Sequence, residues 1–192
     1  MIIYKDIITN DEMFTDSSKV KLVDDCLYEV QCQVCIAFKN GCVFINYFLF
    51  IQYVTRRQGE ITLEGANPSA EEFEEGTDDS VESGLDLVLN QRLVETGFSK
   101  ADYKNYIKTY TKALQEKWKE NGKSAEEIEH AKTKVTEAIK KILPKLGDYK
   151  FYLGESSNPD GMVALLDYRE GPDGNEVPTM LFLKHGLEEE KV

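Results

Sequence analysis

The densest group of residues that could bind a metal ion is a run of carboxylates near the middle of the chain. Between residues 58 and 91 there are ten carboxylates and no Lys or Arg. Oxygen ligands of the kind that Ca²⁺ prefers are offered by Glu71, Glu72, Glu74, Glu75, Asp78 and Asp79. The run lacks the alternating acids, central Gly and terminal Glu of an EF-hand. It predicts either a weak Ca²⁺ site of about millimolar affinity or a solvated, mobile acidic loop at residues 65–80.

Cysteine and histidine offer less chemistry. Cys32 and Cys35 form a C-x-x-C pair, but the second ligand pair of a structural zinc site is missing, so no zinc is expected. His130 lies on a charged helical segment and His185 near the end of a strand, and neither has a nucleophile beside it in sequence. We interpret both as solvated or packed histidines. Because phosphate-binding glycine loops, HExxH and GxSxG are also absent, the sequence predicts no enzyme.

The composition excludes one class of partner. The 192 residues carry a net charge of −12, with 41% apolar and 30% charged residues, which suits a single domain with a real core. An acidic chain lacks the basic face that binds nucleic-acid phosphates and is better suited to divalent cations or basic protein patches. The start, MIIYKDIITND, has no apolar run typical of a signal peptide, so a cytoplasmic protein is expected.

Two helices are predicted between residues 99 and 143. Ser99, with Asp102 in the first turn, begins the first helix, and a capping box of Ser124 and Glu127 begins the second. The apolar stripe of the first helix is Tyr103, Ile107, Tyr110, Leu114 and Trp118. The short connection predicts an antiparallel hairpin. With eleven Lys and seven acidic residues, this hairpin is mildly basic.

Strands are predicted on both sides of the hairpin. Those before it are MIIYKDII, CLYEVQC, YVTRRQGEITL and LDLVLNQRLVETGF, and those after it are YKFYLGE, MVALLDYRE and VPTMLFLKHG. Asp173-Gly174 is a hairpin signal between the last two strands. The sum is an α+β fold of antiparallel sheets that carry one helical hairpin.

Several strings of this sequence, in order, resemble the translationally controlled tumour protein family. They are MIIYKDIITNDEMF, GANPSAEE, FYLGESSNPDGMVALLDYREG and VPTMLFLKHGLEEEK, and the NPSAE loop and GMVALLDYRE strand are the two signature regions of the family. The resemblance implies one domain over residues 1–192. Its implied fold is an antiparallel β-tent, similar to that of the zinc-carrying chaperones of Rab GTPases, with a protruding two-helix hairpin and a mobile acidic loop.

The resemblance also implies a function. Members are cytosolic, multi-partner regulators of growth and survival that are associated with Ca²⁺, microtubules and tubulin, small GTPases, a translation elongation factor and anti-apoptotic proteins. None has an established catalytic site. On this chain, Glu12 corresponds to the GTPase-facing glutamate, which leaves open a guanine-nucleotide-exchange regulator or an ordinary turn acid. The family region linked to tubulin and Ca²⁺ contains Lys104, Lys108 and Lys112, whose charge suits acidic tubulin tails better than Ca²⁺.

One segment, residues 34–52, falls outside the resemblance. Residues 33–35 can be encoded by codons that match a 5′ splice junction, and residues 48–52 by codons that form a pyrimidine-rich tract ending in AG. The favoured hypothesis is therefore a translated, unspliced intron, and the alternative is a true insertion. A membrane span is not expected, because the apolar run is interrupted by Lys39, Asn40, Gly41 and Asn46.

Overall fold

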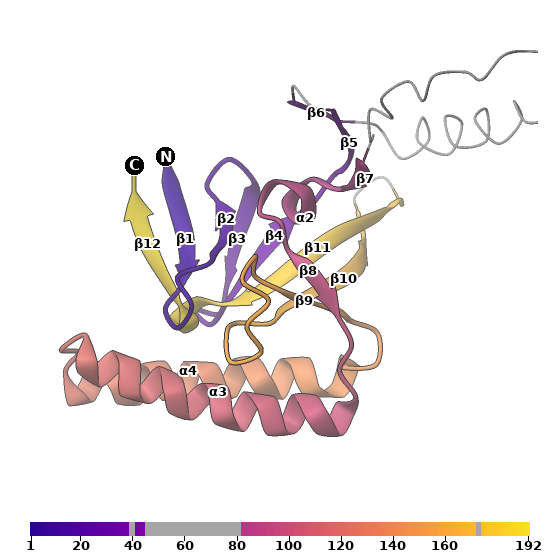
Figure 1. Cartoon of the computed structure of the whole chain (residues 1–192). Helices are drawn as coiled ribbons and strands as arrows, with labels where there is room; N and C mark the ends of the chain where they lie inside the picture. Colours follow the sequence, from indigo (N-terminus) through magenta and orange to yellow (C-terminus); the bar gives the residue numbers. More distant parts are fainter. Residues whose placement is uncertain (39–40, 45–81, 172–173) are drawn as a thin grey trace, which may run out of the picture. The chain divides into compact units, whose positions relative to one another are not determined.

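The structure is a computed structural model that describes residues 1–38, 41–44, 82–171 and 174–192. The chain divides into two compact units, one of Met1–Cys32 with Leu87–Val192 and the other of Gln33–Asp86. The larger unit contains two antiparallel sheets and the helical hairpin, and the smaller contains a separate antiparallel sheet (Figure 1).

The first sheet of the larger unit brings the two ends of the chain together. Its central strand is β1 (Ile2–Asp6), which pairs with β2 (Glu12–Thr15) on one side and β12 (Leu187–Lys191) on the other. The N-terminal ammonium group donates a hydrogen bond of 2.9 Å to the carbonyl oxygen of Val192. The predicted N-terminal strand is confirmed, and Figure 1 shows both termini at the same edge.

The second sheet has six antiparallel strands in the order β3-β4-β11-β10-β9-β8. Four of its strands, β4, β9, β10 and β11, confirm strands that were predicted from the sequence. Asp173 of the predicted hairpin signal lies outside the described residues, but β10 and β11 pair as expected. The bounds are β3 Lys19–Val23, β4 Leu27–Gln31, β8 Val94–Thr96, β9 Lys150–Leu153, β10 Ala164–Glu170 and β11 Glu176–Leu183.

An aromatic cluster joins the two sheets. The ring centroid of Phe14, on β2, lies 4.3 Å from that of Tyr4 on β1 and 4.7 Å from that of Phe182 on β11. Tyr28 on β4 completes the cluster, at 5.7 Å from Phe14. Such ring pairs add to the stability that comes from burying apolar area, so this cluster holds the three-stranded sheet against the six-stranded one.

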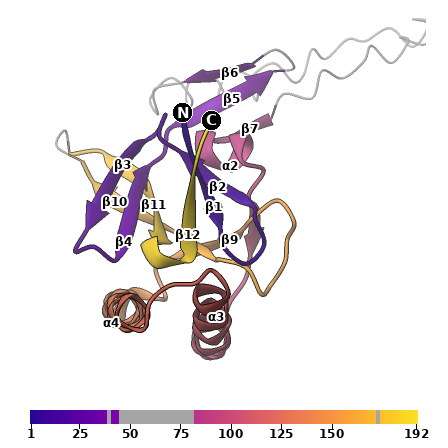
Figure 2. The ribbon, with the colours of Figure 1, turned by 90° about the vertical axis from the view of Figure 1, so that its left-hand side faces the viewer.

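The predicted helical hairpin is confirmed as α3 (Lys100–Glu120) and α4 (Ala125–Ile142), followed by the short 3-10 helix η1 (Leu143–Lys145). Both helices begin with complete capping boxes. The side chain of Ser99 accepts a hydrogen bond from the amide of Asp102, and that of Ser124 accepts one from the amide of Glu127. The apolar stripe predicted for α3 is buried, with Trp118 fully so. The two helices run side by side beneath the sheets (Figure 2).

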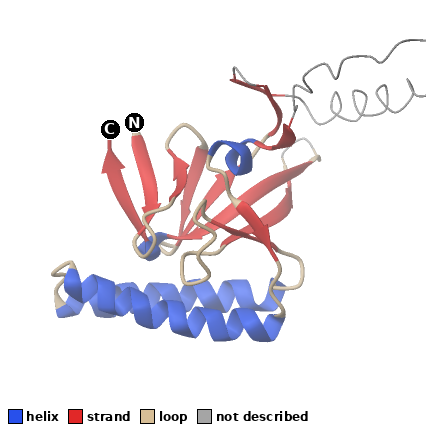
Figure 3. Cartoon of the chain, in the orientation of Figure 1, coloured by secondary structure: helices blue, strands red, loops and turns tan. Residues whose placement is uncertain are grey.

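The strand predicted over LDLVLNQRLVETGF is only partly correct. Its first part is a short helix, α2 (Asp86–Asn90), and only Val94–Thr96 is a strand, β8 (Figure 3). The amide of Gln91 donates to the carbonyl of Leu87, and Arg92 has a positive φ of 51° that ends the helix. A short apolar run fits a helix or a strand equally well by periodicity, so the sequence could not decide.

The smaller unit contains the described part of the segment predicted as an insert. Its sheet has the order β6-β5-β7, with β5 (Val34–Phe38) paired to both β6 (Gly41–Phe44) and β7 (Glu82–Leu85). Residues 34–38 and 41–44 are thus strands of this sheet. The predicted acidic loop at residues 65–80 and the YVTRRQGEITL strand lie outside the described residues.

Candidate functional site

The lysines predicted to face tubulin form a row on the solvent side of α3. Because the apolar stripe faces inward, Lys104, Lys108 and Lys112 are exposed, and their spacing of four residues stacks them on one face. At a rise of 1.5 Å per residue, the row extends about 12 Å along the helix. Within the described parts of the chain, none of the three lysines takes part in an ion pair. We call these residues the lysine row.

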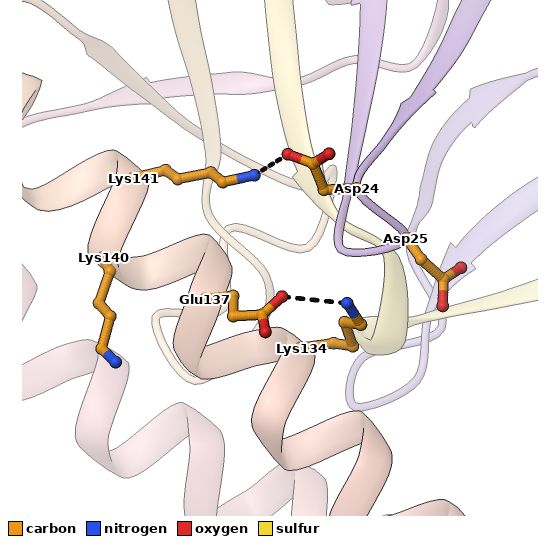
Figure 4. A pocket seen from close by; sticks show the side chains of 6 residues that line it. All are labelled: Asp24, Asp25, Lys134, Glu137, Lys140 and Lys141. Carbon is orange, nitrogen blue, oxygen red and sulfur yellow. Dashed lines mark hydrogen bonds and ion pairs between the residues drawn. The ribbon is translucent and has the colours of Figure 1, made fainter.

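A charged cleft of about 690 Å³ lies between α4 and the turn that joins β3 to β4. Its charges are largely paired: Lys141 contacts Asp24, and the Nζ of Lys134 lies 3.0 Å from an oxygen of Glu137 (Figure 4). The hydrogen bond from Lys141 lowers the pKa of Asp24. The lining is completed by Asp25 and Lys140. A lining of acids and lysines alone suits polar contact with a partner rather than nucleophilic chemistry.

The turn that carries the two acids has an unusual backbone. Asp24 and Asp25 both have positive φ, of 50° and 58°, and the amide of Cys26 donates to the carbonyl of Val23. This is the geometry of a type I′ turn, which usually contains Asn or Gly because few side chains tolerate positive φ. The two carboxylates point to different sides of the turn (Figure 4). That of Asp24 meets Lys141, and that of Asp25 meets Lys184.

Glu12, the predicted GTPase-facing residue, is the first residue of β2, at the edge of the three-stranded sheet. Its side chain is about half exposed, at 48%, and its carboxylate lies 3.8 Å from the Nζ of Lys5. Lys5 in turn has a closer ion pair with Glu190 on β12. Glu12 therefore shares its cation with another acid, so a partner can approach its carboxylate from the solvent side.

The six acids predicted to bind Ca²⁺ all lie outside the described residues, so the structure provides no geometry for that site. The described cysteines are placed differently. Cys26 and Cys32 are buried in the larger unit, and Cys35 is disulfide-bonded.

No local pattern in the sequence predicts a buried carboxylate, but the structure contains one. Asp6 at the end of β1 is fully buried, and its carboxylate accepts hydrogen bonds from the amide of Met162, at 3.0 Å, and the hydroxyl of Tyr110, at 3.2 Å. Thr9 donates from both its amide and its hydroxyl. Burial raises the pKa of Asp6, although the hydrogen bonds from Met162 and Thr9 act in the opposite direction. Asp6 thus links β1, α3 and the loop before β10.

The two histidines are also brought together by the fold. The ring centroids of His130 on α4 and His185 in η2 (Lys184–Gly186) lie 5.9 Å apart. One ligand atom from each histidine and one from Asp25 all lie within 4.8 Å of one another. The interpretation of both histidines as solvated or packed side chains did not foresee this cluster, because Asp25 and His185 are 160 residues apart in the chain.

None of the described helices combines the length and apolar character needed to cross a bilayer.

Comparison with known proteins gives consistent matches along the whole chain. The family model described as translationally controlled tumour protein matches residues 1–188. A translationally-controlled tumor protein homolog from Grammostola rosea is 66% identical over 192 residues and one from Drosophila melanogaster 47% over 193, with 99% or more of each chain covered. Among solved structures, the tumour-associated protein p23fyp of Schizosaccharomyces pombe has 37% identity and a TM-score of 0.69, with both chains fully covered. The Caenorhabditis elegans homologue has 35% identity and a TM-score of 0.64, with coverage of 100% and 99%.

Proposed function

Because this chain belongs to the translationally controlled tumour protein family, we propose that it is a non-enzymatic, multi-partner regulator that works in the cytoplasm. The family resemblance supplies its partners: microtubules, small GTPases, a translation elongation factor and anti-apoptotic proteins, with weak Ca²⁺ binding on the acidic run. Different partners would use different surfaces of the protein, and the chain needs no catalytic centre for this role.

The observation that best supports this proposal is the lysine row. Three ammonium groups on one face of a capped, well-packed helix are a fixed pattern of positive charge on a chain whose net charge is −12. Because these lysines have no described ion-pair partner, an acidic peptide can bind them without first displacing a carboxylate of the protein itself. Tubulin tails have that chemistry, and charges held close together attract acidic partners more strongly than isolated charges. We therefore assign microtubule binding to the outer face of α3.

The test is co-sedimentation of the full chain with microtubules at low and high salt. The substitutions Lys104→Gln, Lys108→Gln and Lys112→Gln together should weaken binding about tenfold or more, if each exposed ion pair contributes about 0.5–1 kcal/mol. Salt should weaken wild-type binding and have less effect on the variant, because the screened charges are those already removed.

A matched control separates the position of the charges from their number. Lys19→Gln, Lys21→Gln and Lys191→Gln remove the same three charges from exposed positions on β3 and β12. This control should bind as the wild type does. Equal losses for both triple variants would show that net charge alone drives the contact and would contradict the assignment to α3.

A second candidate, a guanine-nucleotide-exchange regulator of a small GTPase, is favoured by the position of Glu12. A half-exposed carboxylate at a sheet edge, 3.8 Å from its nearest described cation, can form an ion pair with a basic side chain of a GTPase switch region or compete for the Mg²⁺ of the GTPase. The test is nucleotide release from a small GTPase with the wild type, with Glu12→Val, and with Glu188→Val as a control, on β12 at the opposite edge of the same sheet. Acceleration by the wild type and the control but not by Glu12→Val supports this candidate. No acceleration by the wild type removes it.

Weak Ca²⁺ binding is assigned to Glu71, Glu72, Glu74, Glu75, Asp78 and Asp79. Calorimetric titration of the full chain with Ca²⁺ should give heat with about millimolar affinity. The heat should vanish when these acids are replaced by Gln and Asn. A titration without heat would leave the run as a solvated acidic loop.

A further inference from the structure

Three side chains with metal-binding atoms converge from three elements of the larger unit. Asp25 belongs to the turn between β3 and β4, His130 to α4 and His185 to η2, and their ligand atoms lie within 4.8 Å of one another. They include both histidines of the chain. We propose that Asp25, His130 and His185 form a binding site for a transition-metal ion of the Zn²⁺ class, with two imidazole nitrogens and one carboxylate oxygen as ligands.

The ring of His185 is held in an orientation suited to a ligand. Its Nε2 lies 3.1 Å from the backbone carbonyl oxygen of Asp25. When Nε2–H donates to that carbonyl, the lone pair of Nδ1 remains for a metal. Histidines that bind metals usually donate their second ring nitrogen to a carbonyl or carboxylate in this way, which fixes the tautomer and the ring plane.

The backbone around His185 is fixed as well. The indole Nε1 of Trp118 donates to the carbonyl of His185 at 3.0 Å, and the amide of Lys184 donates to the carbonyl of Cys26, also at 3.0 Å. These bonds tie η2 both to α3 and to the turn that carries Asp25. Two of the three ligands are therefore placed relative to each other before an ion arrives.

The third ligand can complete the geometry. A tetrahedral site with bonds of 2.0–2.2 Å needs ligand atoms about 3.3–3.6 Å apart, so the present cluster, with ligand atoms within 4.8 Å of one another, must contract by about 1.2–1.5 Å at its widest. His130 can supply this movement, because it is exposed on α4 and its ring is held by no described hydrogen bond. Its ring already meets that of His185 edge to face, at an interplanar angle of 84°.

The groups around the cluster favour a metal ion that prefers nitrogen ligands over Ca²⁺. One oxygen of Asp25 contacts Lys184, which leaves the other oxygen for a metal, and Lys134 on α4 adds a further positive charge nearby. A single shared carboxylate beside ammonium groups is a poor site for Ca²⁺, which needs several oxygens. Imidazole ligands suit Zn²⁺, Cu²⁺ and Ni²⁺.

The test uses the histidine ring signals in the NMR spectrum of the full chain, titrated with Zn²⁺ alone and then with Ca²⁺ alone. Because the chain has only two histidines, their signals report this site even if Zn²⁺ also binds the acidic run or a cysteine. We expect both signals to move in parallel and to saturate at one equivalent of Zn²⁺, with no movement in Ca²⁺. The thermal midpoint should rise with Zn²⁺, because the ion binds only the folded arrangement.

The variant His130→Gln should weaken Zn²⁺ binding at the His185 signal at least tenfold and abolish the thermal shift. His130 is exposed, so this change should leave the fold intact, and Glu129→Gln beside it is the matched control that should behave as the wild type. Histidine signals that stay still, that move with different midpoints, or that respond equally in His130→Gln would overturn the proposal.

Discussion

The two sides of helix α3 differ in how their polar groups are used. On the inner side, Tyr110 donates to the buried carboxylate of Asp6, and Trp118 donates to the carbonyl of His185. On the outer side, the lysine row has no described ion-pair partner. The difference shows that one helix can stabilise the fold with one face and present charge to partners with the other. Substitutions on the inner side should therefore change stability, and those on the outer side should change binding.

The largest effect is expected for Trp118, which is fully buried. Trp118→Ala should lower the free energy of unfolding by about 3–5 kcal/mol, through lost packing and a cavity. Chemical denaturation measures this loss. Trp118→Phe keeps most of the packing and removes only the hydrogen bond to His185, so it should be much milder. Similar losses for both would show that the hydrogen bond, not the packing, holds η2 against α3.

A smaller but clear loss is expected at Asp6. Asp6→Ala leaves the donors on Thr9, Tyr110 and Met162 without their acceptor, and such unsatisfied buried groups cost about 1–3 kcal/mol. Asp6→Asn keeps one acceptor oxygen and should lose less. Denaturation of the two variants under identical conditions gives the comparison. If Asp6→Ala is as stable as the wild type, the hydrogen bonds to the Asp6 carboxylate do not help to hold α3 against the three-stranded sheet.

The pH dependence of stability provides a separate test of Asp6. Burial raises its pKa above the ordinary value of 3.8, so the folded state holds this proton more tightly than the unfolded state does. Its contribution is fully present below pH 3.8 and is lost as the pH rises through the folded pKa. Subtracting the stability curve of Asp6→Asn from that of the wild type should reveal this fall. A difference that rises with pH in that range would mean that the hydrogen bonds outweigh burial.

The outer side should be nearly neutral for stability. The triple variant of the lysine row, Lys104→Gln, Lys108→Gln and Lys112→Gln, should unfold within about 0.5 kcal/mol of the wild type, as surface substitutions usually do. Thermal and chemical denaturation check this before any binding experiment. A large loss would show that the lysines support the fold and would weaken the contrast between the two sides of α3.

The smallest effect is expected at the ion pair between Asp24 and Lys141, at the solvent-exposed edge of the charged cleft. The partner lysine lowers the pKa of Asp24, so the stability that it contributes is present above pH 3.8 and lost as the pH falls through the lowered pKa. Asp24→Asn should lower the thermal midpoint slightly at neutral pH and not at all in strong acid. A midpoint shift that persists in acid would mean that the substitution acts on the backbone of the turn and not on the ion pair.

Much of the fold follows from local signals. Each capping box needs a serine and an acid three residues apart, and the apolar stripe of α3 repeats every three or four residues, so the hairpin and the outward position of the lysine row were predictable. The region of α2 was not, since its short apolar run fits two structures. For residues 34–52, intact mass and the cDNA sequence will decide between a translated intron and an insertion.

The sequence by itself thus determined the family, the helical hairpin and the exposed lysines, because those features depend on neighbours along the chain. Only the tertiary structure decided the burial of Asp6 and the meeting of Asp25, His130 and His185. These groups are separated by up to 160 residues, and no local pattern encodes such a distance. They meet because the two sheets and the hairpin of the larger unit pack around one core, which brings the turn after β3, the middle of the chain and its C-terminal region to a common point.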